Sequence, residues 1–226
     1  MDFKAGEIFA IDKPYRISSF GALAHVRYVL SRTLGYKVKI GHAGTLDPLA
    51  TGVLILCTGK ATKRIEEFQG QTKEYTATLQ LGATTVSYDM EHEVNETFPT
   101  AHITRALIDE KLQQFVGDIE QTPPTYSAVK VNGDRAYELR RAGEEVKLKP
   151  KQIHIDEIEV TDFDAEKMLL SIRVVCGKGT YIRALARDLG RALDSGAYLT
   201  ALRRTRVGDF TIEKSLDYEH IKEWIE

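Results

Sequence analysis

Residues 41–52 read Gly-His-Ala-Gly-Thr-Leu-Asp-Pro-Leu-Ala-Thr-Gly, and this stretch contains one carboxylate, Asp47. Glycine permits positive φ angles and a close approach of the backbone to a ligand. Pro48 fixes its own φ and restricts Asp47 to extended geometry, so the carboxylate is presented by the loop. Leu-Asp-Pro in a glycine-rich loop is also a common turn. By itself, the stretch therefore predicts either an active-site loop or an ordinary turn.

The segments on both sides of this loop are predicted to be core strands. Residues 38–40 lead into it, and residues 53–57 leave it as an apolar run of strand length. An earlier strand is expected over residues 6–12, followed by a helix that Ser18 or Ser19 caps and that ends at Gly35. Its apolar positions recur at helical spacing and predict the core stripe Phe20, Leu23, Val26, Leu30 and Leu34.

The rest of the chain mixes strands and helices. Residues 73–81 alternate as a strand does, with Tyr75, Ala77, Leu79 and Leu81 on one face. Further elements are predicted as a helix over 104–115, strands over 152–163 and 168–176, a helix after Gly179 and a short helix over 218–225. We expect an α+β fold with a central mixed or antiparallel β-sheet flanked by helices, in one domain over residues 1–226.

The helix after Gly179 carries a predicted basic face. Arg183, Arg187 and Arg191 are four residues apart, whereas the apolar residues of this helix fall on the other side. The spacing therefore predicts that the three arginines point away from the core.

Composition narrows the class of protein. The chain has 226 residues and a net charge of −2, and no apolar stretch approaches the length of a membrane span or the pattern of a signal peptide. Cys57 and Cys176 lie in apolar runs and are expected to be reduced core residues. Without cysteines at metal spacing, we predict no metal site. We expect a cytoplasmic monomer that does not bind membranes.

The charges are strongly segregated along the chain. Residues 13–64 hold nine Lys and Arg against one acid, and residues 178–206 hold seven against two. Residues 89–120 hold eight acids against two bases, and residues 209–226 hold six against two. Basic stretches on an otherwise acidic molecule are typical of a surface that meets a phosphate backbone, although solvated basic faces are also common.

Five further motifs accompany the Asp47 loop in a fixed order. They are Ile11-Asp12-Lys13-Pro14 with Ser18-Ser19, Lys73-Glu74-Tyr75, Pro-Pro-Thr-Tyr-Ser-Ala-Val-Lys at 123–130, Gly-Lys-Gly-Thr-Tyr-Ile-Arg at 177–183, and Leu202-Arg203-Arg204 with Val207-Gly208. Together with the loop, this set resembles the TruB family of tRNA pseudouridine synthases over roughly residues 6 to 210. The resemblance implies the pseudouridine synthase fold and an isomerase that converts the T-loop uridine of tRNA, position 55, to pseudouridine.

The resemblance also implies roles for individual residues. Asp47 matches the family's catalytic aspartate and Arg183 the arginine that pairs with it. Tyr75 matches the tyrosine that stacks on the target base and assists proton removal from it, which makes it the third catalytic candidate. His42 matches the histidine that fills the gap left by the flipped uridine, and Tyr181 and Leu202 match residues that wall the pocket. No cofactor is implied. Phosphate contacts with the T-arm and elbow of tRNA are assigned to Lys13, Lys60, Lys63, Arg64, Lys130, Arg203, Arg204 and Arg206.

Four alternatives are compared with this interpretation. Thr58-Gly59-Lys60-Ala61-Thr62 fails as a P-loop, because the first glycine would have to stand at Leu54 and Ala61 replaces the required Ser or Thr. A non-catalytic RNA-binding module would bind tRNA without product. A glycoside hydrolase would need Asp47 and a second carboxylate such as Asp89 or Glu91. A guide-RNA-dependent relative would carry an extra domain, and we see no sequence sign of a C-terminal RNA-binding domain of the PUA type, which makes this a short or truncated member.

Overall fold

The computed structural model describes residues 2–127, 129–131 and 133–225, so the motif residue Ala128 lies outside the described residues. Contacts divide the chain into two compact units. Unit 1 comprises residues 1–76 and 202–226, and unit 2 comprises residues 77–201. Strands β4 (Lys73–Leu81) and β12 (Ala197–Val207) each have residues in both units. A single domain over residues 1–226 stays a prediction.

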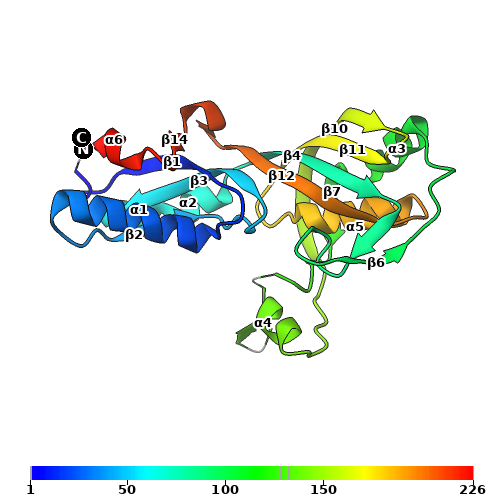
Figure 1. Ribbon diagram of the computed structural model, residues 1–226, viewed down its shortest axis with the longest axis horizontal. Helices are drawn as coiled ribbons and strands as arrows, with labels where there is room; N and C mark the ends of the chain where they lie inside the picture. The colour runs from blue at the N-terminus through cyan, green and yellow to red at the C-terminus, as the bar shows by residue number, and fades with distance from the viewer. Residues whose placement is uncertain (1, 128, 132, 226) are drawn as a thin grey trace. The chain divides into compact units, whose positions relative to one another are not determined.

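Unit 1 is built on a mixed sheet (Figure 1). Its order is β14-β1-β3-β12, with β2 added to β3 and β13 added to β12. Strand β1 is antiparallel to β3 and parallel to β14, whereas β12 is parallel to β3. The strands are β1 (Ile8–Lys13), β2 (Ile40–Ala43), β3 (Thr51–Thr58), β13 (Phe210–Thr211) and β14 (Leu216–Asp217).

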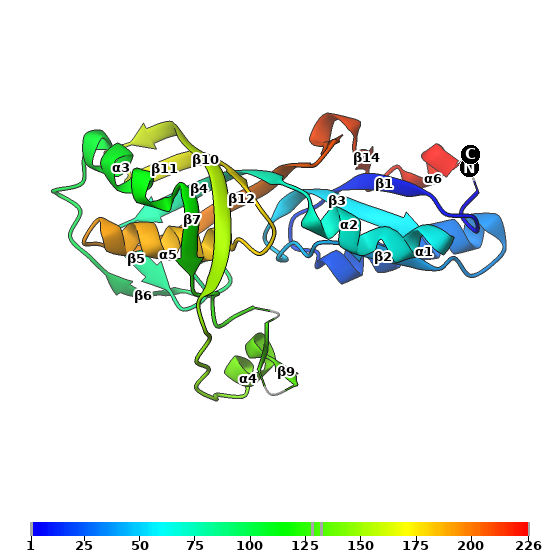
Figure 2. The ribbon, with the colours of Figure 1, turned by 180° about the vertical axis from the view of Figure 1, so that it is seen from behind.

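Helices α1 (Ser19–Leu34) and α2 (Ile65–Gly70) cover opposite faces of this sheet, as the front and back views show (Figures 1 and 2). Successive strand residues point to opposite faces, so Leu54 packs toward α1 and Ile55 packs toward α2. The terminal helix α6 (Ile221–Ile225) packs beside α1. The remaining short helices of this unit are the 3₁₀ segments η1 (Gly59–Arg64) and η3 (Ile212–Lys214).

The caps predicted for α1 are confirmed, but one core position is wrong. The Ser18 hydroxyl accepts a hydrogen bond from the Gly21 amide at 3.0 Å, and Gly35 ends the helix with φ of 72°. Helical spacing predicts Phe20 in the buried stripe, yet its side chain is 66% exposed. The buried residue of the first turn is Ser19, whose hydroxyl bonds to Leu46 of the Asp47 loop and which lies one residue, and therefore 100°, around the helix from Phe20.

Unit 2 contains strands in the order β12-β4-β11-β10-β7 together with two small hairpins. Its other strands are β5 (Ala83–Thr85), β6 (Val94–Thr97), β7 (Gly117–Gln121), β8 (Lys130–Val131), β9 (Asp134–Arg135), β10 (Lys151–Asp164) and β11 (Leu169–Cys176). Its helices are α3 (Arg105–Leu112), η2 (Gln113–Phe115), α4 (Ala136–Arg141) and α5 (Ile182–Ala192). The predicted α+β class with a mixed sheet and flanking helices is confirmed.

Several local predictions are also confirmed. The alternating face of β4 is buried at every predicted position from Tyr75 to Leu81. Cys57 and Cys176 are free and buried, and burial raises the pKa of the Cys57 thiol to about 11, as suits an unreactive core residue. Within the described ranges, no helix is long and apolar enough to cross a bilayer.

Candidate functional site

The Asp47 loop lies where strand β3 changes its neighbour. Along one edge, residues 55–58 of β3 pair with β2, whereas residues 51 and 52 pair with β12. The chain leaves β2 at Ala43 and enters β3 at Thr51, so the intervening loop occupies the junction of the two pairings. Asp47 is partly exposed there, between the buried residues Leu46 and Ala50. The prediction that two core strands anchor this loop is confirmed.

Three buried side chains hold the loop backbone at alternate residues. Arg204 donates to the Gly44 carbonyl at 3.1 Å and to the Val53 carbonyl at 2.8 Å. Lys13 donates to the Pro48 carbonyl at 3.4 Å. These two cations come from β12 and β1, so strands distant in sequence meet at the loop.

The third side chain, Ser19, fixes the residue immediately before Asp47. Its hydroxyl accepts a hydrogen bond from the Leu46 amide at 2.8 Å and donates one to the Leu46 carbonyl at 2.9 Å. Ser19 is 2% exposed, so water cannot easily replace either bond. The backbone on both sides of Asp47 is thus fixed, while the carboxylate itself keeps access to solvent.

Gly52 is required where β3 and β12 come together. Its φ is 106°, and a Cβ atom placed there would lie 2.1 Å from the carbonyl oxygen of Arg204. Only glycine tolerates both the backbone conformation and this close approach. The last glycine of the loop sequence therefore lets Arg204 lie against the loop.

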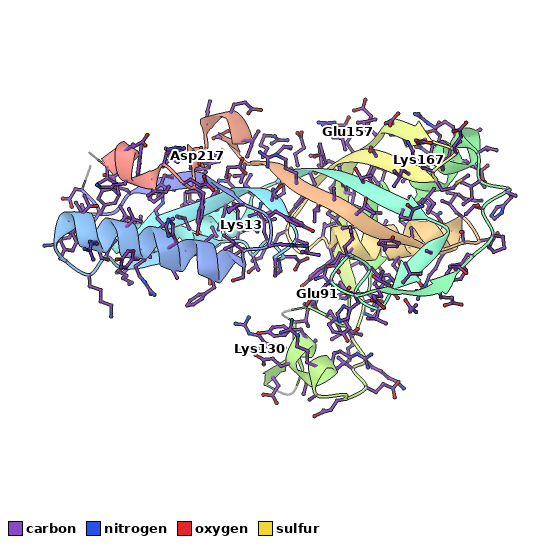
Figure 3. The ribbon with its side chains drawn as sticks, viewed as in Figure 1. Lys13, Glu91, Lys130, Glu157, Lys167 and Asp217 are labelled. Atoms are coloured by element: carbon purple, nitrogen blue, oxygen red, sulfur yellow. The ribbon has the colours of Figure 1, made fainter. Side chains whose placement is uncertain are left out.

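Lys13 and Arg204 are not phosphate contacts, which corrects the prediction. Lys13 is fully buried, and its ammonium also donates to the carbonyls of Ile17 at 2.6 Å and Pro14 at 2.9 Å; Figure 3 labels it within unit 1. Arg204 is 1% exposed. Both cationic groups donate hydrogen bonds to backbone carbonyls inside the protein, so neither can reach an RNA backbone.

The ammonium of Lys13 also interacts electrostatically with Asp47. Burial lowers the pKa of Lys13 to about 8, the Asp47 carboxylate raises it, and Arg204 lowers it again. At neutral pH, Lys13 is therefore still mostly protonated and supplies a buried positive charge beside the loop. The Asp47 loop thus has a buried cation beneath it.

Three other predicted residues lie in unit 1. Tyr75 is 8% exposed on the inward face of β4, and Leu202 is partly buried at the start of the unit 1 section of β12. His42 lies on β2, and its Nδ1 atom is buried without a hydrogen-bond partner among the described residues. Burial and the neighbouring Arg204 lower the pKa of His42, so its imidazole is neutral at physiological pH.

In unit 2, Arg183 is held in the first turn of α5. Its guanidinium donates to the carbonyl of Ser87 at 3.2 Å and to that of Tyr126 at 2.9 Å, and its Nε lies 3.7 Å from a carboxylate oxygen of Asp89. Asp89 is itself buried and accepts a hydrogen bond from the Ser87 hydroxyl at 2.5 Å. Asp89 is thus committed to this network and does not resemble the free second carboxylate of a glycoside hydrolase.

The predicted basic face of α5 is wrong. Arg183 and Arg187 are 5% and 8% exposed, and only Arg191 of the three points into solvent. Arg187 donates to the Thr122 carbonyl at 2.8 Å and pairs with Asp188. Helical spacing correctly placed the arginines on one face, but neighbouring segments of unit 2 cover that face and supply acceptors.

The start of α5 is tied to strand β7. The Tyr181 amide donates to the side-chain oxygen of Gln121 at 2.8 Å, and the side-chain nitrogen of Gln121 donates to the Tyr181 carbonyl at 3.2 Å. Gln121 therefore fixes the backbone that carries Tyr181 and, two residues later, Arg183.

A cavity of about 960 Å³ opens further along α5 and is lined in part by Arg187, Asp188 and Arg191.

The other predicted cations differ in their accessibility. Lys60, Lys63 and Lys130 are exposed, and Figure 3 labels Lys130 beside α4 in unit 2. Arg64 is exposed but forms a two-bond pair with Glu67. Partly buried pairs hold the remaining two: Arg203 with Asp12 at 2.7 Å, and Arg206 with Glu74 at 3.5 Å.

Sequence reasoning missed Ser19, Gln121 and the partnership of Asp89 with Arg183. The sequence does contain one signal for the role of Ser19. Ser18 and Ser19 are adjacent, and only one of them can cap the helix, so the other hydroxyl is available for a different contact. No local pattern marks Gln121 or Asp89, since their partners are distant in the sequence. Among the described residues, no group of His, Cys, Asp and Glu side chains could hold a metal ion.

Two family models match consecutive parts of the chain. The model described as TruB family pseudouridylate synthase (N terminal domain) matches residues 31–182, and the model described as tRNA pseudouridylate synthase B C-terminal domain matches residues 183–226. The first alone covers more than half of the chain.

Full-length relatives agree with these matches. Proteins named tRNA pseudouridine synthase B are 63% identical over 229 residues in Bacteroides thetaiotaomicron and 60% identical over 227 residues in Phocaeicola vulgatus. Each alignment covers 100% of this chain, with 95% and 96% of the respective relative.

A solved structure, the crystal structure of a Cbf5-Nop10-Gar1 complex, contains a chain similar in fold. The TM-score is 0.71 at 28% sequence identity, and the alignment covers 99% of this chain. This chain spans only 56% of the other, so the similarity is to about half of that protein. The pseudouridine synthase fold expected from the sequence is confirmed.

Proposed function

This chain belongs to the TruB family of pseudouridylate synthases, and we propose from that premise that it isomerises uridine 55 in the T-loop of tRNA to pseudouridine. The reaction breaks the bond between the ribose C1′ atom and N1 of uracil, turns the base, and joins C5 to C1′. C5 loses a proton and N1 gains one, so the reaction needs no net supply of atoms or electrons. We infer that no cofactor is required.

The observation that carries the proposal is the construction of the Asp47 loop. Arg204, Ser19 and Lys13 fix its backbone at Gly44, Leu46 and Pro48, yet Asp47 remains partly exposed. A carboxylate that is positioned in advance loses little freedom when substrate arrives, which favours attack or proton removal at a defined atom. An ordinary turn has no need of two buried cations and a buried hydroxyl.

Asp47 is the proposed catalytic residue. It acts either as a nucleophile toward the ribose or the ring, or as a base that removes a ribose proton. The buried charge of Lys13 lies close enough to interact electrostatically with it. Arg183 is the further counter-charge that the family pattern implies, and its network with Asp89 and Ser87 would hold the guanidinium in one orientation.

The remaining residues are proposed to hold the flipped nucleotide. Tyr75 offers an aromatic ring against the base, and Tyr181 and Leu202 wall the pocket. Flipping the uridine out of its base stack costs a few kcal/mol and leaves a gap in the stack. The neutral imidazole of His42 is proposed to occupy that gap. Exposed cations at Lys60, Lys63, Arg64 and Lys130 are proposed to contact phosphates, with Arg203 and Arg206 contributing where their acidic partners release them.

The relatives favour tRNA as the substrate over a guide-RNA-dependent reaction. The proteins named tRNA pseudouridine synthase B are 60–63% identical, whereas the Cbf5 complex contains a chain at 28% identity. We infer a monomer that acts in the bacterial cytoplasm, where tRNA is modified.

The test uses the protein alone with an unmodified tRNA transcript in EDTA and monovalent salt. Modification is mapped by primer extension after chemical labelling of pseudouridine. Product at position 55 alone is the expected result. Binding without product would instead favour a non-catalytic module, and product only after addition of a guide RNA would favour the alternative relative. Either result would overturn the proposal.

A further inference from the structure

Helix α1 has an outward face of aromatic and arginine side chains. Phe20 is 66% exposed and Tyr28 is 60% exposed, and the turn before the helix adds Tyr15, which is 46% exposed. The Arg16 guanidinium lies 5.4 Å from the centre of the Tyr15 ring, and Arg32 donates a hydrogen bond to the Tyr28 hydroxyl at 3.2 Å. We refer to these five residues as the α1 outer face.

The packing of the protein core does not explain this face. The buried residues of α1 are Ser19, Ala22, Leu23, Val26 and Leu30, which lie on the opposite side of the helix. Helix α6 also contacts α1, and in the segment just before α6 the ring of Tyr218 lies 4.7 Å from that of His25. Phe20 and Tyr28 keep most of their surface in solvent despite these contacts. Large aromatic side chains are enriched on surfaces that bind partners.

The helix itself and the turns on both sides of it carry only positive charges, whereas Asp217, Glu219 and Glu223 belong to the C-terminal segment that packs beside α1. Residues 14–39 contain five Lys and Arg and no Asp or Glu. A protein-binding surface is usually depleted of charge at its centre, whereas aromatic rings between cations are typical of single-stranded nucleic acid sites, where bases stack and phosphates pair. This charge pattern therefore favours RNA over a protein partner.

The spacing along the helix also suits a nucleotide chain. Phe20 and Tyr28 are eight residues apart, which corresponds to about 12 Å along a helix axis. Consecutive bases in a stacked strand rise by about 3.4 Å. The two rings can therefore each take one base of the same strand, three or four nucleotides apart.

The α1 outer face begins beside the Asp47 loop. Phe20 directly follows Ser19, whose hydroxyl makes both hydrogen bonds to Leu46, the residue before Asp47. The helix then runs for 16 residues to Leu34, along the same face of the sheet (Figure 1). RNA engaged at Asp47 would thus have the first aromatic ring of this face close by.

We infer that the α1 outer face is a second RNA-binding surface, on which unpaired nucleotides of the substrate stack on Phe20 and Tyr28 while Arg16 and Arg32 contact their phosphates. The inference rests on the proposed function for the identity of the RNA. It adds an anchoring site for nucleotides other than the target uridine. Its contribution is to affinity, because these side chains belong to the exposed side of α1 and do not hold the loop.

The experiment measures binding of an unmodified tRNA transcript by filter retention at two salt concentrations, for wild type, Phe20→Ala, Tyr28→Ala and Arg32→Gln. Each alanine variant should raise the Kd by about fivefold or more, as expected for losing one stacked base. Arg32→Gln should weaken binding. It should also reduce the slope of log Kd against log salt by the contribution of about one phosphate contact. In steady-state kinetics, the loss should appear in KM rather than in kcat.

Two controls separate stacking from a general loss of exposed apolar surface. Phe20→Trp keeps a ring and should retain wild-type affinity, and Val94→Ala removes an exposed apolar side chain from unit 2 and should change neither Kd nor KM. Unchanged Kd and KM in both aromatic-to-alanine variants would overturn the inference. So would a wild-type dimer in sedimentation that Phe20→Ala converts to monomer, because the face would then be an interface between copies.

These outcomes are distinct from failure of the proposed function. If wild type binds tRNA but forms no pseudouridine, the proposed reaction fails, while the binding comparison still decides whether the α1 outer face holds RNA. If wild type is active and the variants bind equally well, the reaction stands and the second surface is refuted.

Discussion

Replacing Ser19 with alanine should weaken both the fold and the catalysis, because one buried hydroxyl satisfies two backbone groups of Leu46. Each buried group left without a partner costs about 1–3 kcal/mol. The loss of two bonds at a residue that is 2% exposed therefore predicts a decrease of about 2–6 kcal/mol in the free energy of unfolding. Since Leu46 precedes Asp47, the same change should let the carboxylate drift and lower kcat at least about tenfold.

Urea denaturation measures the first effect, and release of the C5 hydrogen as tritium from labelled tRNA measures the second. Ser31→Ala is the matched control on the same helix, because its hydroxyl accepts a single bond, from the Val38 amide at 3.0 Å. The control should lose about 1 kcal/mol and keep its kcat within twofold. A Ser19→Ala protein with wild-type kcat would refute the positioning role of Ser19.

Two further predictions concern the cations and the glycine around the loop. The pKa of Lys13 is about 8 in the folded protein, below its ordinary value of 10.5. Between pH 8 and 10.5 the unfolded chain therefore binds more protons at this lysine than the folded protein does, and the free energy of unfolding rises with pH. Over the same range the positive charge of Lys13 beside Asp47 disappears. The kcat/KM profile should therefore fall as pH rises through about 8, and a Lys13→Met protein with the same alkaline fall would contradict this origin. Gly52→Ala should cost about 3 kcal/mol or more in urea denaturation, because of its φ of 106° and the Arg204 carbonyl 2.1 Å from the new Cβ. Gly35→Ala, with φ of 72° and open space, should cost only about 1 kcal/mol.

Local patterns in the sequence were sufficient for α1, for β4 and for the strands around the loop that carries the candidate site, but they did not predict β7 or β12. The serine and glycine caps, the alternation over residues 73–81 and the strands around Asp47 all depend on interactions between near neighbours in the chain. Such interactions leave a direct periodic signal. The motif order then identified the family, since several motifs in a fixed order carry more information than any one of them.

Burial of charged residues could not be predicted in the same way. Lys13, Arg204 and Arg187 look like surface cations in the sequence, but each finds carbonyl acceptors supplied by segments far away in the chain. Phe20 shows the opposite error, because helical spacing does not tell which side of a helix the sheet will cover at its first turn. These errors share one cause: the environment of a side chain depends on tertiary contacts that periodicity does not encode.

A single-turnover comparison is the sharpest test of whether Asp47 performs the isomerisation. Wild type, Asp47→Asn and Asp209→Asn are each mixed in excess with labelled tRNA, and pseudouridine is quantified after nuclease digestion. Asp209 is exposed in the same unit, so its asparagine variant makes the same charge change away from the loop. We expect Asp47→Asn to bind tRNA without forming product, while Asp209→Asn reacts like wild type. Product from Asp47→Asn at the wild-type rate would refute the catalytic role of Asp47.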